Sequence, residues 1–134
     1  MGGPLEGLVI ADFTQLAQGP FATQMLGDMG AEIIKIEPPK GDWMRHWSMA
    51  NLYLEGEGVS FLSFNRNKRS ICLDLKHPRG KEVALRLIAR SDVLVENFRP
   101  GVMDRLGLGY DTLSALNPGI IYATIKGFGT TGPY

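Results

Sequence analysis

The sequence predicts an α/β fold with an open, mostly parallel sheet and flanking helices. Residues 8–37 have the pattern of a strand, a turn, a helix and a second strand. Two later apolar runs, residues 92–96 and residues 120–125, each follow a segment with helical signals. Parallel strands need crossover connections, so this alternation of strands and helices indicates a parallel sheet with a ligand crevice at its carboxyl edge.

The first unit has clear boundaries. Residues 8–11 form a short apolar run, typical of a strand buried on both faces, and residues 32–37 contain three isoleucines that suit a pleated surface. Between them, Gly19 and Pro20 begin a helix, because proline fits the first helical turn. Gly30 ends the helix, because glycine tolerates a positive φ.

The middle of the chain departs from this alternation. Residues 38–58 form a proline-containing excursion with Trp43 and Trp47, which either cover a ligand or cover core left open by an absent part of the protein. Residues 59–64 and 70–75 both alternate apolar and polar side chains around a polar turn, so we expect a hairpin or a strand–turn–strand there. The three cations of that turn either meet phosphates or are solvated.

The remaining elements resume the alternation. Helical signals cover residues 80–90, a short segment ending at residues 105–106, and residues 111–116, whereas strand signals cover residues 92–96 and 120–125. The glycine-rich residues 126–134 would normally lead into another helix. We therefore expect residues 1–134 to be the amino-terminal part of a larger domain.

Composition excludes several classes of protein. The 134 residues are 44% hydrophobic and carry 14 basic and 14 acidic side chains, which does not favour nucleic acid or an anionic membrane as a partner. The single cysteine, Cys72, lies in an apolar run and is expected to be a buried thiol in a reducing compartment. Without a leader or a membrane-spanning run, the sequence favours a soluble, cytoplasmic protein.

Four predicted strand ends converge at one edge of the sheet and form the candidate site. Asn97 offers a donor and an acceptor, Phe98 offers a flat apolar face, and Arg99, Arg105 and Lys126 supply cations for phosphates. A nucleotide-like ligand suits this set. The alternative is that Asn97 caps a turn and the cations are solvated.

Familiar phosphate and metal motifs are weak or missing. Residues 127–132 match G-x-G-x-x-G, but no helix or acidic residue follows within the chain. The turn before Gly19 lacks the paired glycines that a pyrophosphate needs, which argues against an NAD enzyme even though Glu37 ends the second strand as a ribose-binding acid would. No P-loop, C-x-x-C or H-E-x-x-H motif occurs in the sequence.

Five stretches together resemble the amino-terminal part of class III coenzyme A transferases, the CaiB/BaiF or formyl-CoA transferase type. In order they are GLVIADFTQLAQGP, LGDMGAEIIKIEPPKGD, NRNKRSICLDLKHPRGKE, DVLVENFRPGVMDRLGLGYDTL and LNPGIIYATIKGFGTTGPY. The resemblance covers essentially the whole chain.

The resemblance implies a Rossmann-like large domain, incomplete in this chain, with a second, smaller domain absent and an intertwined homodimer in the full-length protein. It also implies transfer of CoA between an acyl-CoA thioester and a carboxylic acid, with CoA as substrate and no prosthetic group or metal. The nucleophile would be an aspartate beyond Tyr134, so residues 1–134 would contain no catalytic residue and the chain alone would be inactive. An acyl-CoA racemase of the same family and a non-catalytic nucleotide-binding fragment are the alternatives.

Carried over by position, the resemblance also implies a set of CoA contacts in the first turn, near the adenine, along the ligand and at a phosphate. They are Ala17, Gln18, Leu73, Asp74, Leu75, Lys76, Asn97, Phe98, Arg99 and Arg105. The chain departs from the formyl-CoA branch where Ala17 and Gln18 stand in the reverse order and where Pro38 replaces an arginine.

Overall fold

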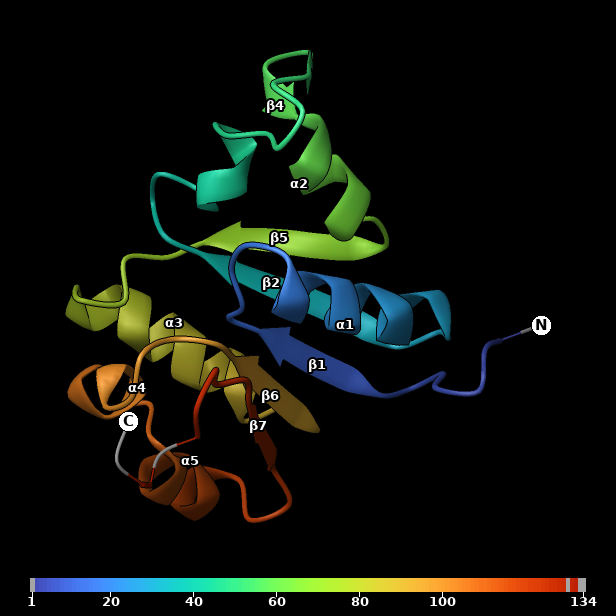
Figure 1. Ribbon diagram of the computed structural model, residues 1–134. Coiled ribbons are helices and arrows are strands. Elements are labelled where there is room, and N and C mark those ends of the chain that lie inside the picture. The colour runs from blue at the N-terminus through green and yellow to red at the C-terminus, as the bar shows by residue number, and fades with distance from the viewer. Residues whose placement is uncertain (1, 130, 133–134) are drawn as a thin grey trace.

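The computed structural model describes residues 2–129 and 131–132; Thr130 and the final pair of the glycine-rich segment lie outside the described residues. Its centre is a five-stranded sheet in the order β5-β2-β1-β6-β7, with every neighbouring pair parallel (Figure 1). The strands are β1 (Val9–Asp12), β2 (Glu32–Glu37), β5 (Lys68–Cys72), β6 (Val93–Glu96) and β7 (Ile121–Thr124). The predicted fold class is confirmed.

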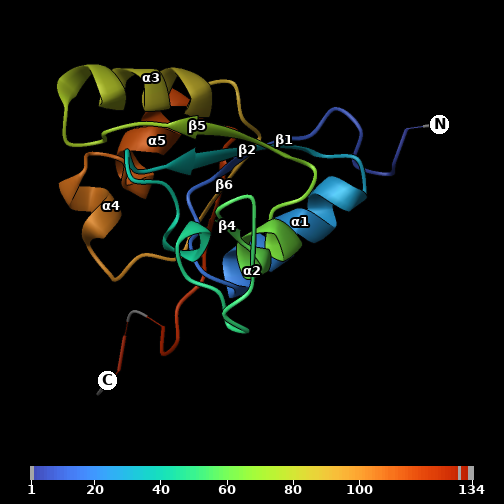
Figure 2. The same cartoon turned by 90° about the horizontal axis from the view of Figure 1, so that it is seen from above.

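Helices cover both faces of the sheet. They are α1 (Gln18–Asp28), the 3-10 helix η1 (Trp43–Arg45), α2 (Val59–Phe64), α3 (Pro78–Ile88), α4 (Val102–Arg105) and α5 (Tyr110–Leu116). Figure 2 shows α3 and α5 on one side of the sheet and α1 and α2 on the other. A small antiparallel hairpin, β3 (Tyr53–Leu54) and β4 (Glu57–Gly58), lies between η1 and α2 in the chain.

The core divides along the pleat of the strands. Ala11 and Leu94 belong to the larger apolar cluster, which also takes in side chains of α3, α4 and α5. Ile10, Ile33 and Val95 point to the opposite face and belong to a smaller cluster against which α1 packs through Leu26. Alternate residues of one strand therefore serve two cores, as expected for a sheet buried on both sides.

The predicted hairpin over residues 59–75 is wrong. Residues 59–64 form helix α2, and Lys68–Cys72 forms a strand parallel to β2 rather than antiparallel to its neighbour in sequence. Two parallel strands cannot be joined by a tight turn, so the chain between β2 and β5 needs a crossover, and η1 and α2 supply it. The helical contact from Ser63 Oγ to the carbonyl of Val59, four residues earlier, fits this assignment.

The expected burial of Cys72 is also wrong, because its thiol is exposed. Cys72 ends β5, the edge strand, where Ile71 and Leu73 pack on the larger core and the alternation turns Cys72 away from it. Within the described ranges, no helix is both long and apolar enough to cross a membrane.

Candidate functional site

The carboxyl ends of the strands carry buried acids, and each acid is already paired. Asp12 lies 3.0 Å from Lys68 Nζ, Glu37 lies 2.7 Å from Arg45 Nη2, and Glu96 lies 2.7 Å from Lys126 Nζ. A buried carboxylate is tolerated when it is paired and hydrogen-bonded. These three acids therefore shape the turns around the site.

Asp12 holds the first turn. Its Oδ1 accepts hydrogen bonds from the backbone N–H of Thr14 at 2.9 Å and from the Thr14 hydroxyl at 2.5 Å, and its Oδ2 accepts from Thr23 Oγ1 at 2.6 Å. Burial by itself raises the pKa of the carboxyl, but Lys68, Lys35 and the two threonines outweigh burial and keep the pKa below its ordinary value. Asp12 therefore serves as an acceptor that holds this turn.

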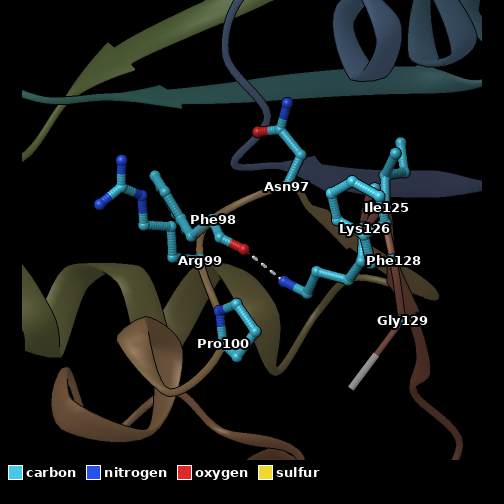
Figure 3. Close-up of a pocket in the computed structure, with 9 residues that line it drawn as sticks. Asn97, Phe98, Arg99, Pro100, Ile125, Lys126, Phe128 and Gly129 are labelled. Atoms are coloured by element: carbon cyan, nitrogen blue, oxygen red, sulfur yellow. Dashed lines mark hydrogen bonds between the residues drawn. The ribbon is translucent and has the colours of Figure 1, made fainter. Parts of the chain in front are cut away.

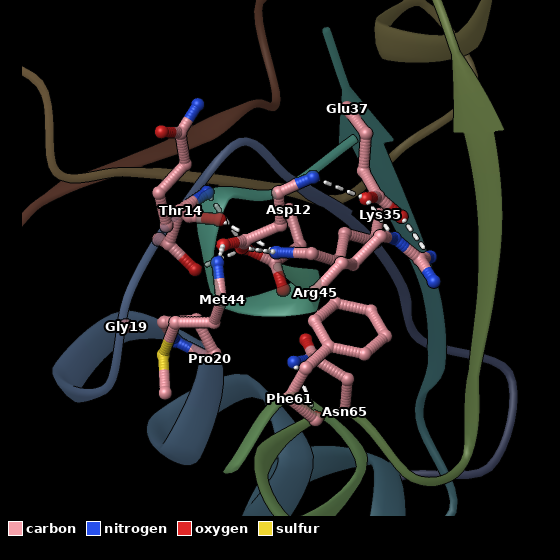
Figure 4. Close-up of polar contacts among 12 residues, drawn as sticks. Asp12, Thr14, Gly19, Pro20, Lys35, Glu37, Met44, Arg45, Phe61 and Asn65 are labelled. Carbon is pink, nitrogen blue, oxygen red and sulfur yellow. Dashed lines mark hydrogen bonds and ion pairs between the residues drawn. The ribbon is translucent and has the colours of Figure 1, made fainter. Parts of the chain in front are cut away.

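Glu37 is occupied by Arg45. The guanidinium donates to both carboxylate oxygens at 2.7 and 2.8 Å, and Ser70 Oγ and the backbone N–H of Asp42 also donate to Glu37. Burial opposes ionisation, yet these donors lower the pKa of Glu37 to about 2. The guanidinium carbon of Arg45 also lies 3.9 Å from the centre of the Phe61 ring, and Figure 4 shows these two side chains as neighbours. Glu37 therefore has no free oxygen for a ribose.

A buried lysine joins the first turn to η1 (Figure 4). Lys35 is almost wholly inaccessible, and its Nζ donates to the carbonyl of Thr14 at 2.7 Å and pairs with Asp42 Oδ2 at 2.9 Å. The other oxygen of Asp42 accepts from the backbone N–H of Met44 at 2.9 Å and so caps η1. One ammonium group therefore fixes two neighbouring loops relative to each other.

Asn97 fixes a third loop to the first turn. Its Oδ1 accepts from the backbone N–H of Gln15 at 2.9 Å, and its Nδ2 donates to the carbonyl of Gln15 at 2.8 Å. The side chain thus acts as a two-way bridge between the loops after β1 and β6. Its amide is used within the protein, which supports the turn-capping alternative for this residue.

Three adjoining cavities follow these loops. The first, which we call the tryptophan pocket, has a volume of about 330 Å³. It is lined by Leu16, Ala17, Gln18, Trp43, Met44, Trp47, Met49 and Asn97. Trp43 and Trp47 stack with their ring centres 5.1 Å apart and their planes 9° apart. The interpretation of the two tryptophans as cover for a ligand gains support from this lining.

The second cavity, the strand-end slot, lies on the α3 side of the sheet edge and has a volume of about 170 Å³. Its lining is mostly apolar and consists of Phe13, Gln15, Ile36, Glu37, Pro38, Pro39, Leu73, Asp74, Leu75, Lys76, Phe98 and Leu106. It adjoins the tryptophan pocket through the sequence neighbours Gln15 and Leu16 and through Asn97 and Phe98.

The third cavity, the basic cleft, has a volume of about 360 Å³ and shares Leu75, Lys76 and Leu106 with the strand-end slot. Lys76, Lys81 and Arg105 give it three cations and no acidic side chain. Within residues 2–129 and 131–132, these cations form no ion pair with a carboxylate. The cleft is therefore a concentration of uncompensated positive charge.

A further cavity of about 310 Å³ lies beside the loop after β6 (Figure 3). Arg99 and Phe98 line it together with residues 125–129. Lys126 Nζ bonds both oxygens of Glu96, at 2.7 and 2.9 Å, and the carbonyl of Phe98 at 2.5 Å. The prediction of Lys126 as a cation for phosphate is wrong, because its three donors are satisfied internally.

All ten residues that the resemblance implies line cavities at the carboxyl edge of the sheet. Ala17, Gln18 and Asn97 lie at the tryptophan pocket, residues 73–76 and Phe98 at the strand-end slot, Arg105 at the basic cleft and Arg99 at the cavity of Figure 3. The predicted cations of the turn after α2 lie elsewhere. Arg66 pairs with Asp28, Lys68 with Asp12, and Arg69 with Glu32.

Sequence reasoning missed Lys81 and the strained turn at Leu16. Lys81 lies three residues after Pro78 in the first turn of α3, a spacing that puts both on one face of the helix. Leu16 has a φ of 67°, which is rare for a residue other than glycine, and no glycine marks the turn in the sequence. Strained backbone of this kind clusters at binding and catalytic sites.

The amino terminus of α1 opens next to the tryptophan pocket. Ala17 and Gln18 occupy the cap and the first helical position, and no side chain caps this end of the helix. The first N–H groups of a helix have no internal partner, and the helix dipole places positive charge there. This end of α1 can therefore stabilise a partly negative oxygen.

Known proteins are similar to this chain in sequence and in structure. A model of CoA-transferase family III matches residues 5–134. An acyl-CoA transferase of Fusarium pseudograminearum is 51% identical over 98% of this chain and 30% of its own length. Succinyl-CoA:glutarate CoA-transferase of Mus musculus is 48% identical over 97% of this chain and 30% of its own length.

A solved structure supports the same relationship. The crystal structure of a CAIB/BAIF family protein from Brucella suis matches with a TM-score of 0.94 at 43% identity, over 100% of this chain and 36% of that chain. The chain therefore spans about a third of the length of the proteins it matches. Because the family model matches nearly every residue, the chain belongs to CoA-transferase family III.

Proposed function

We propose that this chain is the CoA-binding part of an enzyme that transfers CoA between an acyl-CoA thioester and a carboxylic acid. One observation carries the proposal: the basic cleft shares three lining residues with the strand-end slot, and the slot is lined by sequence neighbours of the tryptophan pocket, so the three cavities follow one another along the carboxyl edge of the sheet. The groups of an acyl-CoA follow the same order as these cavities, with phosphates and a purine at one end of the molecule and the thioester at the other.

The basic cleft suits the 3′-phosphate. Lys76, Lys81 and Arg105 converge on it, and the amino terminus of α3 begins at Pro78 in its wall. A phosphate needs charge-assisted donors and is favoured at the amino end of a helix. Arg105 is exposed and unpaired among the described residues, so its guanidinium is free to bind.

The strand-end slot suits the adenine. Two prolines and Phe98 supply flat apolar surface, and residues 73–75 form the facing wall. The backbone of Asp74 and Leu75 carries N–H and C=O groups for the edge of a purine, as most ligand pockets pair an apolar lining with a few polar groups. The slot opens at Lys76 into the basic cleft, which places adenine and phosphate next to each other.

The tryptophan pocket then receives the thioester. Ala17 and Gln18 at the start of α1 line this pocket, and no side chain caps this end of the helix. The free N–H groups of the first turn would stabilise the oxyanion of a thioester under attack. Sequestration beside Trp43 and Trp47 would keep water from the acyl group.

The proposed chemistry is covalent and requires a carboxylate nucleophile. That carboxylate attacks the carbonyl carbon of the thioester. The C–S bond breaks, CoA leaves as a thiolate, and the acyl group stays on the enzyme as a mixed anhydride. The thiolate attacks the enzyme-side carbonyl and releases the first acid, which leaves an enzyme thioester. The acceptor carboxylate then attacks this thioester, releases CoA thiolate, and forms a second anhydride. Attack by the thiolate on the acceptor carbonyl gives the new acyl-CoA and regenerates the enzyme carboxylate.

We place the nucleophile outside residues 1–134. The buried acids among the described residues are Asp12, Glu37, Asp42 and Glu96, and each is held in an ion pair. The proposal also assigns the chain to the amino-terminal part of a larger domain that pairs as a homodimer. Exposed apolar side chains on the α1 and η1 side support this assignment, since Phe21 is 49% and Met49 is 61% accessible.

The test compares CoA with dephospho-CoA, which lacks the 3′-phosphate. Arg105→Ala should weaken CoA binding about tenfold in calorimetry and leave dephospho-CoA unchanged, because a hydrogen bond to a charged group contributes roughly 1.5–3 kcal/mol. Arg90→Ala, two residues after the end of α3 and away from the three cavities, is the control and should change neither affinity. If Arg105→Ala weakened the binding of both ligands equally, the assignment of the 3′-phosphate to the basic cleft would be refuted.

A further inference from the structure

We propose that the tryptophan pocket selects carboxylic acids with an apolar chain over dicarboxylic acids of the same length. This inference rests on the proposed function and concerns the part of the substrate that the CoA group does not determine. Its basis is the chemistry of the lining: two tryptophans, two methionines and a leucine surround the space beside the first turn of α1.

The apolar wall is built largely from exposed side chains. Trp43 and Trp47 are 53% and 41% accessible and stack almost in parallel. Met49 is 61% accessible and Leu16 is 44% accessible, so both also present apolar surface to the pocket. Aromatic and thioether side chains give favourable contact to alkyl and aryl groups.

A buried ion pair holds this wall in place. Asp42 caps η1 at Met44 and is fixed by Lys35. Lys35 also holds the carbonyl of Thr14, two residues before Leu16 in the other part of the lining. The pocket therefore does not depend on the ligand to bring its two sides together. A preformed apolar site loses little free energy to ordering when a ligand enters.

The lining offers no counter-charge for a second carboxylate. Its polar side chains are Gln18 and Asn97, and Asn97 already bonds both backbone groups of Gln15. Arg45 is paired to Glu37 and Glu57, and Lys35 is paired to Asp42. Lys40 and Arg99 form no ion pair within the described part of the chain, but neither of them lines the pocket. A carboxylate that enters an apolar site without a partner keeps its full desolvation cost. This lining differs from what a dicarboxylate acceptor, such as the glutarate in the name of the Mus musculus relative, requires.

The test uses the full-length protein that carries this chain and two acceptor acids with the same number of carbons. Pentanoate and glutarate differ only at the far end, where a methyl group replaces a carboxylate. With acetyl-CoA as donor and mass spectrometry of the CoA esters as readout, we expect kcat/KM to be at least about tenfold higher for pentanoate.

Three substitutions at the exposed position Trp43 test the role of the apolar wall. Trp43→Ala should lower the preference for pentanoate about tenfold by removing contact with the chain, and Trp43→Arg should raise kcat/KM for glutarate by supplying a cation. Trp43→Phe should retain the preference. Tyr110→Ala, an exposed aromatic on α5 at the other face of the sheet, is the matched control and should leave the ratio unchanged.

The outcomes separate this inference from the proposed function. A preference for glutarate in the unmodified protein, or an unchanged ratio in both Trp43→Ala and Trp43→Arg, would overturn the selection by the tryptophan pocket while CoA transfer stands. CoA binding without transfer to either acid would also overturn it. Loss of CoA binding in calorimetry would instead refute the proposed function itself.

Discussion

The ion pair between Lys35 and Asp42 makes the sharpest prediction about stability. Both side chains are 1% accessible, and their Nζ and Oδ2 atoms lie 2.9 Å apart. Lys35→Met removes the cation and the donor to the Thr14 carbonyl, and it leaves Asp42 Oδ2 without a partner among the described residues. Removal of one member of a buried pair costs roughly 3–5 kcal/mol.

That loss is readily measured. For a urea dependence of about 2 kcal/mol per molar, a loss of 4 kcal/mol lowers the unfolding midpoint by about 2 M. The two tryptophans of the chain, at positions 43 and 47, both follow Asp42 closely in sequence, so their fluorescence reports the unfolding of this region. Arg69→Met is the matched control, because Arg69 also pairs with an acid, Glu32, but is 79% exposed. Its cost should stay within about 1 kcal/mol.

A double variant separates the energy of the Lys35–Asp42 interaction from that of the other contacts of these two side chains. Lys35→Met with Asp42→Asn removes both charges and keeps an acceptor that can cap η1 at Met44. Its loss in free energy of unfolding should be smaller, by at least about 2 kcal/mol, than the sum of the losses of the two single variants. A cost for Lys35→Met no larger than that for Arg69→Met would refute the reasoning.

Two further predictions concern the same edge of the sheet. Glu37 has a folded pKa of about 2 against an unfolded value of 4.5, so its contribution of about 3 kcal/mol is complete above pH 4.5 and is lost as the pH falls toward 2. Glu37→Gln should flatten acid denaturation in this range, and an unchanged acid profile would contradict the assignment. Gly19→Ala should cost about 1–3 kcal/mol in thermal unfolding, because its Cβ would lie 2.3 Å from Thr14 Cβ. Gly127→Ala, with no neighbouring atom within 4 Å, should be near neutral, and equal effects of the two changes would refute the packing argument.

The sequence was sufficient for the parallel sheet because its strands and helices alternate with clear boundaries. The apolar strand runs, Pro20 in the first turn of α1 and Gly30 after its end all act locally, so their effect can be inferred without a partner. The carboxyl edge followed from the topology alone.

The errors came from residues whose structure depends on distant partners. Residues 59–64 alternate apolar and polar side chains in a way that fits a strand, but β2 pairs with Lys68–Cys72 and leaves those residues to the crossover. Lys126 looks free in the sequence and is bound to Glu96, thirty residues away. Lys35 lies two residues from Ile33 and Glu37 on a buried strand face, a spacing that indicates burial but does not reveal Asp42 as its partner.

The most direct test of the CoA-binding arrangement is a crystal structure of the protein with CoA bound. We expect the adenine in the strand-end slot between the prolines and residues 73–75, the 3′-phosphate within hydrogen-bond distance of Arg105 or Lys76, and the sulfur at the tryptophan pocket beside Ala17 and Gln18. CoA bound away from these three cavities, or in the reverse direction with its sulfur in the basic cleft, would contradict the account.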